Sequence, residues 1–256
     1  MRIICFCNNW AGLQVLNFLR AQGEDIACVV MHPPARQKYG AEIAAAAASP
    51  IIDASGLREP GTIETIRKLA PQIGVSAYFG YILKRPVLDL LPMDCINLHP
   101  ALLPYNRGAH PNVWSIVDGT PAGVTLHYVD EGVDTGDIIA QAQVSCDLID
   151  TGETLYRKLE RASVDLFAAT WPRVRKGRTT RTRQDRGAGT SHRVKELERL
   201  AEIDLNRTYP AGKLLDLIRA QTFPAYGGAW FRYQGRKISL RVSFHEEGEP
   251  SNVSRD

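Results

Sequence analysis

Three side chains in the middle of the chain could together move an acyl group onto an amine. Asn97 and His99 stand two residues apart at the end of an apolar run, and Asp134 follows a second apolar run in a loop punctuated by glycines. An amide N–H can stabilise the oxyanion of a tetrahedral intermediate, and an imidazole can take the proton that the attacking amine loses. A carboxylate can orient and charge the imidazole. These three residue types suffice for acyl transfer without a metal.

The trio is a weak signal when it stands alone, because an Asn-X-His pair at a strand end more often closes a loop by hydrogen bonds. The surrounding sequence is far more specific. From residue 73 to residue 139 the chain resembles the folate-dependent formyltransferases in blocks of fixed order and matching gaps: 77–83, 96–104, 107–108, 123–125 and 134–137. The resemblance places the family's catalytic Asn, His and Asp on Asn97, His99 and Asp134, and it implies a formyltransferase enzyme.

The resemblance also implies the formyl donor, N10-formyltetrahydrofolate. In the family the pterin ring of this co-substrate lies between two loops, which correspond here to 80–83 and 130–134. A glycine at the start of the first loop lets the backbone approach a flat ring closely. Core packing is an equally good explanation for Tyr81 and Leu83. The residues expected to bind the donor are Gly80, Tyr81, Ile82, Leu83 and Asp130.

Three classes of amine acceptor fit this chemistry: an amino sugar on a nucleotide carrier, methionyl-tRNA and glycinamide ribonucleotide. A glycinamide ribonucleotide enzyme would end near the long helix expected at 153–175, whereas this chain continues to residue 256. Residues 203–231 resemble the start of the C-terminal region that tRNA and sugar formyltransferases share. The chain ends too early, however, for the full barrel of the tRNA enzymes.

The loop after His99 also helps to separate these acceptors. Its Pro-X-X-Trp-X-Ile pattern at 111–116 resembles the sugar N-formyltransferases, so we expect a nucleotide-linked amino (dideoxy) sugar as the acceptor. Of the remaining histidines, His127 alternates with apolar neighbours in a strand and is interpreted as structural. Arg36 and Lys38 are interpreted as solvated loop charges. The candidate substrate contacts are Trp10, Arg107, His110 and Trp114.

Three alternative functions stay open. The basic segment 176–186 could bind RNA phosphates, which would favour a methionyl-tRNA formyltransferase. A formyltetrahydrofolate hydrolase would use the same three catalytic residues on water in place of the amine. A folate-binding protein without catalytic activity would keep the fold alone.

The composition agrees with a protein that acts on small molecules. Hydrophobic content is 44%, charged content 23% and the net charge +3, so charge alone indicates no polyanionic partner. The five cysteines show no metal-ligand spacing and are expected as free thiols in a reducing compartment. Neither a signal peptide nor an apolar run of about 20 residues, the length of a membrane span, is visible. We therefore expect a cytoplasmic protein with no metal and no membrane partner.

Short apolar runs alternate with helical patterns, which predicts an α/β fold: a Rossmann-like, mostly parallel sheet with flanking helices. The expected strands are 3–7, 26–31, 51–52, 73–78, 95–98, 123–129 and 138–144, and the expected helices are 10–22, 41–48, 62–69 and 153–175. Because ligands bind beyond the carboxyl ends of parallel strands, Asn97 and His99 fall at the ligand edge of this sheet.

The predicted domains are a catalytic domain at 1–176, a linker at 177–190 and a small C-terminal region at 191–256. The C-terminal region is expected to hold helices near 192–200 and 211–220 and a β-hairpin from the runs 229–233 and 237–244. An exposed apolar face on this short region could form a homodimer.

Overall fold

The computed structural model describes residues 1–185 and 187–245, and its main element is a seven-stranded sheet with the order β3-β2-β1-β4-β5-β7-β8. Five strands run parallel, and the last two pair antiparallel at one side. The mostly parallel α/β fold predicted from the sequence is confirmed. The strands are β1 (Arg2–Cys7), β2 (Asp25–Met31), β3 (Ile51–Asp53), β4 (Ile73–Ala77), β5 (Cys95–His99), β7 (Gly123–Tyr128) and β8 (Ile138–Gln143).

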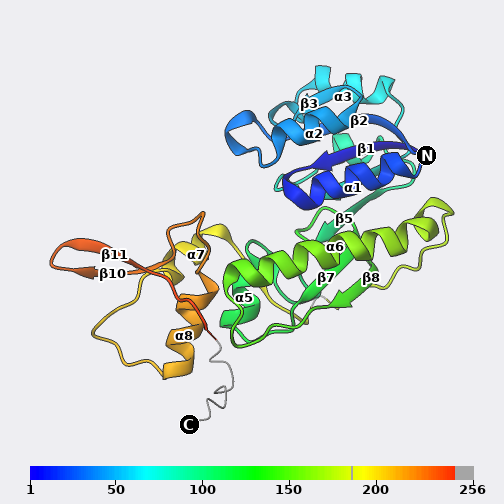
Figure 1. Cartoon of the computed structure of the whole chain (residues 1–256). Helices are drawn as coiled ribbons and strands as arrows, with labels where there is room; N and C mark the ends of the chain where they lie inside the picture. The colour runs from blue at the N-terminus through cyan, green and yellow to red at the C-terminus, as the bar shows by residue number, and fades with distance from the viewer. Residues whose placement is uncertain (186, 246–256) are drawn as a thin grey trace, which may run out of the picture.

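Helices cover both faces of this sheet (Figure 1). In β1, Ile3, Cys5 and Cys7 point into one apolar cluster, whereas Ile4 and Phe6 point into the other. This alternation is the normal two-residue period of a strand that is buried on both faces. The first cluster is closed by α1 (Asn9–Ala21), α2 (Gly40–Ala47) and α6 (Gly152–Arg175), and the second by α3 (Pro60–Lys68) and α4 (Arg85–Leu88).

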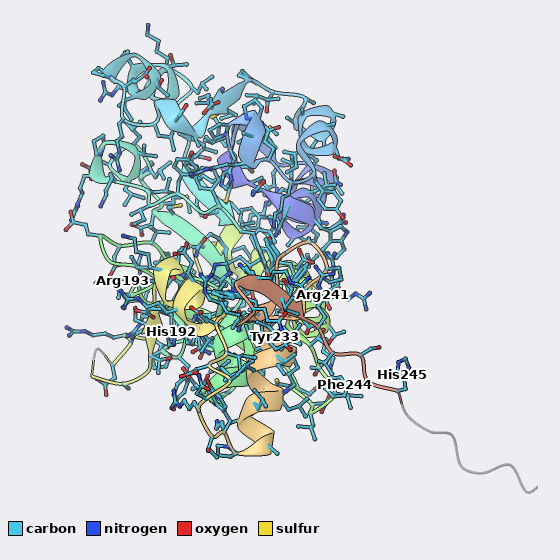
Figure 2. All side chains as sticks on the ribbon, turned by 90° about the vertical axis from the view of Figure 1, so that its left-hand side faces the viewer. His192, Arg193, Tyr233, Arg241, Phe244 and His245 are labelled. Atoms are coloured by element: carbon cyan, nitrogen blue, oxygen red, sulfur yellow. The ribbon has the colours of Figure 1, made fainter. Side chains whose placement is uncertain are left out.

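A third apolar cluster attaches the C-terminal region to the catalytic domain. Val113 and Ile116 of α5 (Pro111–Val117) pack with Leu155 and Leu159 of α6 and with Ala220 of α8 (Ala211–Ala220). Beyond α8, β10 (Ala229–Tyr233) and β11 (Arg236–Leu240) form an antiparallel hairpin that projects away from the sheet in Figure 1. Figure 2 shows this region from the side.

The segment 177–190, predicted as a linker, forms hydrogen bonds with the catalytic domain at several points. Thr182 forms an antiparallel bridge with Ile138 of β8. Further on, β9 (Ser191–His192) pairs in parallel with β6 (Arg107–Gly108), and α7 (Val194–Leu200) follows. Arg186 of the basic segment and residues 246–256 of the predicted C-terminal region lie outside the described residues. Across the described ranges, no helix has the length and apolarity to cross a bilayer.

Candidate active site

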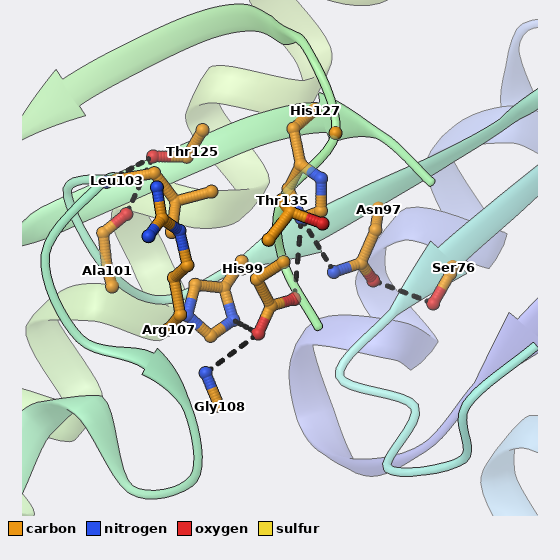
Figure 3. A network of polar contacts seen from close by, with 12 residues as sticks. Ser76, Asn97, His99, Ala101, Leu103, Arg107, Gly108, Thr125, His127 and Thr135 are labelled. Atoms are coloured by element: carbon orange, nitrogen blue, oxygen red, sulfur yellow. Dashed lines mark hydrogen bonds and ion pairs between the residues drawn. The ribbon is translucent and has the colours of Figure 1, made fainter. Parts of the chain in front are cut away.

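The structure brings Asn97, His99 and Asp134 together. Asn97 and His99 lie at the carboxyl end of β5, and Asp134 comes from the loop that joins β7 to β8. Nδ1 of His99 is 3.6 Å from Oδ2 of Asp134. Because β5 pairs with β4 on one side and β7 on the other, the trio occupies the point where the parallel and antiparallel parts of the sheet meet. Figure 3 shows the polar network around it.

His99 is buried, and its hydrogen bonds determine which nitrogen is free. Nε2 lies 3.1 Å from the carbonyl oxygen of Asn106. A carbonyl oxygen only accepts, so Nε2 carries the hydrogen and Nδ1 faces Asp134. Burial lowers the pKa of His99, and the nearby Asp134 carboxylate offsets only part of that effect. His99 is therefore neutral near pH 7, with the Nδ1 lone pair available to accept a proton.

Asp134 is held in its ionised form. Burial opposes its charge, but His99, the contact with His127 and the backbone N–H of Gly108 outweigh burial and hold the pKa of Asp134 well below its ordinary value. The Gly108 N–H donates to Oδ2 over 2.9 Å, and Nε2 of His127 is 3.5 Å from Oδ1. Asp134 adopts a left-handed backbone conformation with φ of 54°. Such a conformation is costly for a residue with a side chain and needs support from its surroundings.

Two residues that the sequence did not single out fix the amide of Asn97. The Ser76 hydroxyl donates to Oδ1 of Asn97 over 2.7 Å, and Nδ2 of Asn97 donates to Nε2 of His127 over 3.1 Å (Figure 3). Nδ1 of His127 donates to the carbonyl of Tyr128, so Nε2 is the accepting nitrogen. Among the described residues, one N–H of Asn97 has no partner and can donate to a substrate oxygen. His127, interpreted from the sequence as structural, contacts two of the three catalytic candidates.

The contact of His127 with Asn97 follows from the pairing of two strands and is not visible in the sequence. Asn97 is opposite His127, and His99 is opposite Thr125, in the antiparallel pairing of β5 with β7. Opposed residues point to the same face of a sheet. The register that brings them opposite each other depends on the tertiary fold, and alternation within one strand does not show it.

The predicted donor residues occupy two loops, 80–83 and 130–134. Arg85, at the start of α4 just after the first loop, forms an ion pair with Glu131 of the second, with Nε and Oε1 2.8 Å apart. Ile82 is 55% exposed and Gly80 is exposed as well, so both can meet a ligand. Leu83 is instead buried in the second apolar cluster, in agreement with the core-packing interpretation.

The other two predicted donor residues have defined partners. Tyr81 meets the ring of His32 edge to face, with ring centroids 5.1 Å apart. The Asp130 carboxylate accepts from Gly132 N–H and from the Thr135 hydroxyl, and so it orders the loop that carries Asp134.

The four predicted substrate contacts do not line one common cavity. Arg107 is buried, and its guanidinium donates to Gln184 and to the carbonyls of Asp185 and Ala188. Trp114 is also buried and stacks on His192, with ring centroids 3.9 Å apart and an interplanar angle of 6°.

Trp10, at the start of α1, is half-buried. Only His110 lines the large cavity described next. The physical reason is burial. The Arg107 guanidinium already binds the protein, and the Trp114 ring is covered by His192, although its buried Nε1 has no hydrogen-bond partner among the described residues.

A cavity of about 570 Å³ lies between the start of α5, the start of α6 and the C-terminal region. His110 lies in its wall and is two residues from Gly108, the backbone partner of Asp134. The wall combines aromatic rings with two lysines, one of which is Lys38, a residue interpreted from the sequence as a solvated charge. The side chains relevant to ligand binding are Lys38, His110, Tyr156, Glu198, Phe223, Tyr226, Trp230 and Lys237.

The chain matches two known protein families, one in each of its parts. Residues 1–170 match the model of the family described as formyl transferase. The chain belongs to the formyl transferase family. Its residues 196–246 also match the family described as the N-formyltransferase dimerization C-terminal domain. The formyltransferase resemblance seen in the sequence is thereby confirmed at the level of the family.

Curated relatives carry the name methionyl-tRNA formyltransferase. The relative from Geotalea daltonii is 31% identical over 99% of this chain and 83% of its own length. The relative from Syntrophus aciditrophicus is 38% identical over 60% of this chain, and the matched part spans 53% of that protein.

Solved structures that match this formyltransferase include sugar N-formyltransferases. A Mycobacterium tuberculosis protein described as a candidate sugar N-formyltransferase has 27% identity and a TM-score of 0.81 over 97% of this chain and 99% of its own. A 4-N formyltransferase from Francisella tularensis has 25% identity and a TM-score of 0.81 over 96% and 98%. A formyltransferase from Anoxybacillus kamchatkensis, in complex with a UDP-linked formamido sugar and tetrahydrofolate, has 28% identity and a TM-score of 0.57 over 78% and 89%.

Proposed function

We propose that this formyltransferase moves the formyl group of N10-formyltetrahydrofolate to a primary amine of a nucleotide-linked amino sugar. The observation that carries the proposal is the preformed site of Asn97, His99 and Asp134, together with a cavity of about 570 Å³. His110 lies in the cavity wall, two residues from Gly108, whose N–H donates to Asp134. A cavity of this size suits a small-molecule substrate. The proposed role of each residue follows from its free atoms.

The reaction begins when the lone pair of the acceptor amine attacks the formyl carbon. The free N–H of Asn97 donates to the oxyanion that forms, which stabilises the tetrahedral intermediate. Nδ1 of His99 accepts the proton that the amine loses, and the Asp134 carboxylate beside it stabilises the imidazolium. The bond from the formyl carbon to N10 then breaks, and N10 takes up the proton from His99. The products are a formamide and tetrahydrofolate.

The donor would lie between the loop at 80–83 and the loop that carries Asp134, where Gly80 and Ile82 are exposed. The folate-bound structure of the Anoxybacillus kamchatkensis enzyme supports this co-substrate. None of the steps proposed above requires a metal. We further propose that the enzyme works in the cytoplasm, which suits its four buried free cysteines.

The acceptor would occupy the large cavity. Aromatic rings such as Tyr226 and Trp230 can stack on a nucleobase, and two ammonium groups can pair with a diphosphate. In this structure Lys38 donates to the Tyr226 hydroxyl and Lys237 lies over the Trp230 ring, so a ligand would have to replace these contacts. The UDP-linked sugar in the Anoxybacillus kamchatkensis complex supports an acceptor of this class. His110 would lie on the path from the cavity to Asp134.

Transfer to methionyl-tRNA is the second candidate, because the curated relatives carry that name and the segment 176–186 is basic. Arg181 of that segment is already engaged, since its guanidinium lies 3.6 Å from the centre of the Tyr128 ring and forms an ion pair with Asp94. This engagement reduces the positive charge that the segment can offer to RNA.

Incubation of the purified enzyme with N10-formyltetrahydrofolate and a panel of acceptors tests the proposal. The panel holds TDP- and UDP-linked amino sugars, their acetylated counterparts as blocked-amine controls, and charged initiator tRNA. Tetrahydrofolate release together with a formamido sugar is the expected result. Release with tRNA alone would transfer the assignment to the tRNA class, and release without any acceptor would indicate a hydrolase.

We also propose that the enzyme is a homodimer, because residues 196–246 match a dimerization domain. Light scattering on the full chain should give twice the protomer mass of 28.4 kDa. A mass of one protomer at every concentration tested would contradict this assembly.

A further inference from the structure

Gln184 joins the Asp134 loop to the segment around Arg107, whose neighbours contact His99 and Asp134. It comes from the segment 177–190 that follows α6, and it is buried although its neighbours Arg183 and Asp185 are exposed. The side-chain oxygen accepts from Nε of Arg107 over 3.1 Å and from Nη2 over 2.9 Å. The side-chain nitrogen donates to the carbonyls of Asp134 over 2.9 Å and of Gly136 over 2.7 Å.

This arrangement uses the full hydrogen-bonding capacity of the Gln184 amide. The oxygen has two lone pairs and the nitrogen two hydrogens, and each has a partner in the protein. A buried polar group with every partner present stabilises a single arrangement of its neighbours. Gln184 is therefore a rigid bridge between the Arg107 loop and the Asp134 loop.

The Asp134 loop, whose carbonyls accept from the Gln184 nitrogen, needs such a bridge. Asp134 has a φ of 54°, and a Cβ built on Gly136 would lie 1.8 Å from the carbonyl oxygen of Tyr128. The loop is thus both strained and closely packed, and the two carbonyls that Gln184 binds flank Thr135. Loss of these bonds would let the backbone of Asp134 relax from its costly conformation.

The segment around Arg107, which donates to the Gln184 oxygen, contacts both His99 and Asp134. Next to Arg107, the N–H of Gly108 donates to the Asp134 carboxylate, and the carbonyl of Asn106 accepts from His99. A shift of Arg107 would therefore move the partners of both His99 and Asp134.

We propose that Gln184 is a positioning residue that sets the alignment of Asp134 with His99. The kinetic effect expected of this role rests on the proposed function. Misalignment of a catalytic group by about 1 Å can cost on the order of a hundredfold in rate. His99 faces two ionisable groups, Asp134 from the β7–β8 loop and His127 from β7. Of these, only the carboxylate raises the pKa of His99.

The test compares Gln184→Glu and Gln184→Leu with wild type, and Arg183→Ala serves as the control from the same segment. The glutamate keeps an acceptor for Arg107 but loses both donors to the Asp134 loop, whereas leucine loses all four bonds. Both variants should lower kcat by roughly tenfold to a hundredfold, with the KM for the donor changed by less than about threefold if binding is intact. In Gln184→Leu the acid limb of the pH profile should move to lower pH, because His99 loses the aligned carboxylate. Gln184→Glu brings a new negative charge to the same loop and is therefore compared by kcat alone.

A second readout does not depend on catalysis. The pKa of His99, followed by NMR in the ligand-free enzyme, should fall in Gln184→Leu and stay unchanged in Arg183→Ala. A drop in kcat without movement of the acid limb or of the His99 titration would show a merely structural role and overturn the proposal. If wild type transfers no formyl group while the His99 titration still moves, the proposed function fails and the positioning role of Gln184 stands.

Discussion

At the scale of single residues, the chemistry of the site depends on which polar atoms of Asn97 and His99 have no hydrogen-bond partner among the described residues. Ser76 and His127 bind two of the polar groups of the Asn97 side chain and leave one N–H available. The carbonyl of Asn106 holds the Nε2 hydrogen of His99 and leaves Nδ1 available. A donor and a base are thus prepared before the substrate arrives, which is the arrangement that electrostatic preorganisation requires.

The pH dependence of the reaction follows from the pKa of His99. Burial lowers this pKa, and His99 can act as a base only when it is deprotonated. Activity should therefore fall on the acid side at a pH below the ordinary histidine value of about 6.5. Asp134→Asn removes the charge that favours the imidazolium, so the pKa should fall further and the acid limb should move to lower pH, with a lower kcat.

Measurement of kcat/KM from pH 4.5 to 9 checks both statements. Asp137→Asn, three positions along the same loop, is the matched control and should leave the limb in place. An acid limb that moves to higher pH in Asp134→Asn would contradict the assigned role of the carboxylate.

The types and order of Asn97, His99 and Asp134 could be predicted from the sequence because they lie in contiguous blocks. The role of His127 could not, because it depends on the pairing of β5 with β7. Arg107 shows the opposite limit. The sequence placed it among the candidate substrate contacts, but burial against Gln184 decides what the guanidinium binds.

At the scale of elements, the loop from Asp130 to Asp137 has little room for change. The Tyr128 carbonyl leaves no room for a side chain at Gly136. Gly136→Ala should therefore displace the loop and lower kcat by on the order of a hundredfold, as expected when a catalytic group moves by about 1 Å. Steady-state kinetics together with a thermal unfolding curve would separate this loss from global unfolding.

Gly61→Ala is the control for this substitution, because a Cβ at Gly61 meets open space and Gly61 lies within α3. Its kcat should match wild type, and its stability should rise by a few tenths of a kcal/mol or more. A Gly136→Ala enzyme with wild-type kcat would show that the position of this loop does not limit the reaction.

The parallel strands could be predicted closely, since the run 3–7 became Arg2–Cys7 and the run 95–98 became Cys95–His99. Buried strands are continuous apolar runs and are visible in a single sequence. Helix α5 was not among the expected helices because it is only seven residues long. The residue before it, His110, has a left-handed backbone conformation. The placement of the segment 177–190 depends on the hydrogen bonds of Gln184, which composition does not show.

At the scale of the whole molecule, the proposed acceptor site is shared between the catalytic domain and the C-terminal region. Lys38, His110 and Tyr156 line the cavity from one side, and Phe223, Tyr226 and Trp230 line it from the other. A site of this kind could not be predicted from the sequence, because it exists only after α8 packs against α5 and α6. The C-terminal region is thus proposed to select the acceptor, whereas the sheet supplies the chemistry.

Tyr226→Ala tests this division of roles. If the ring stacks on the nucleobase, its loss should raise the KM for the nucleotide sugar by roughly tenfold to a hundredfold, the equivalent of about 1–3 kcal/mol for a stacked base. The KM for the folate donor should not change. Tyr233→Ala is the matched control, because Tyr233 is similarly exposed and lies in the same region but not in the cavity wall. Equal effects of the two variants would remove the cavity from the acceptor site.

The single-turnover rate of formyl transfer in Asn97→Ala tests the central claim most directly. With saturating N10-formyltetrahydrofolate and the acceptor identified by the panel, the rate should fall by on the order of a hundredfold or more, because the oxyanion loses its donor. Donor binding, measured by equilibrium titration, should stay close to wild type, and Asn17→Ala on the exposed face of α1 should change neither quantity. A near-wild-type rate for Asn97→Ala would contradict the account.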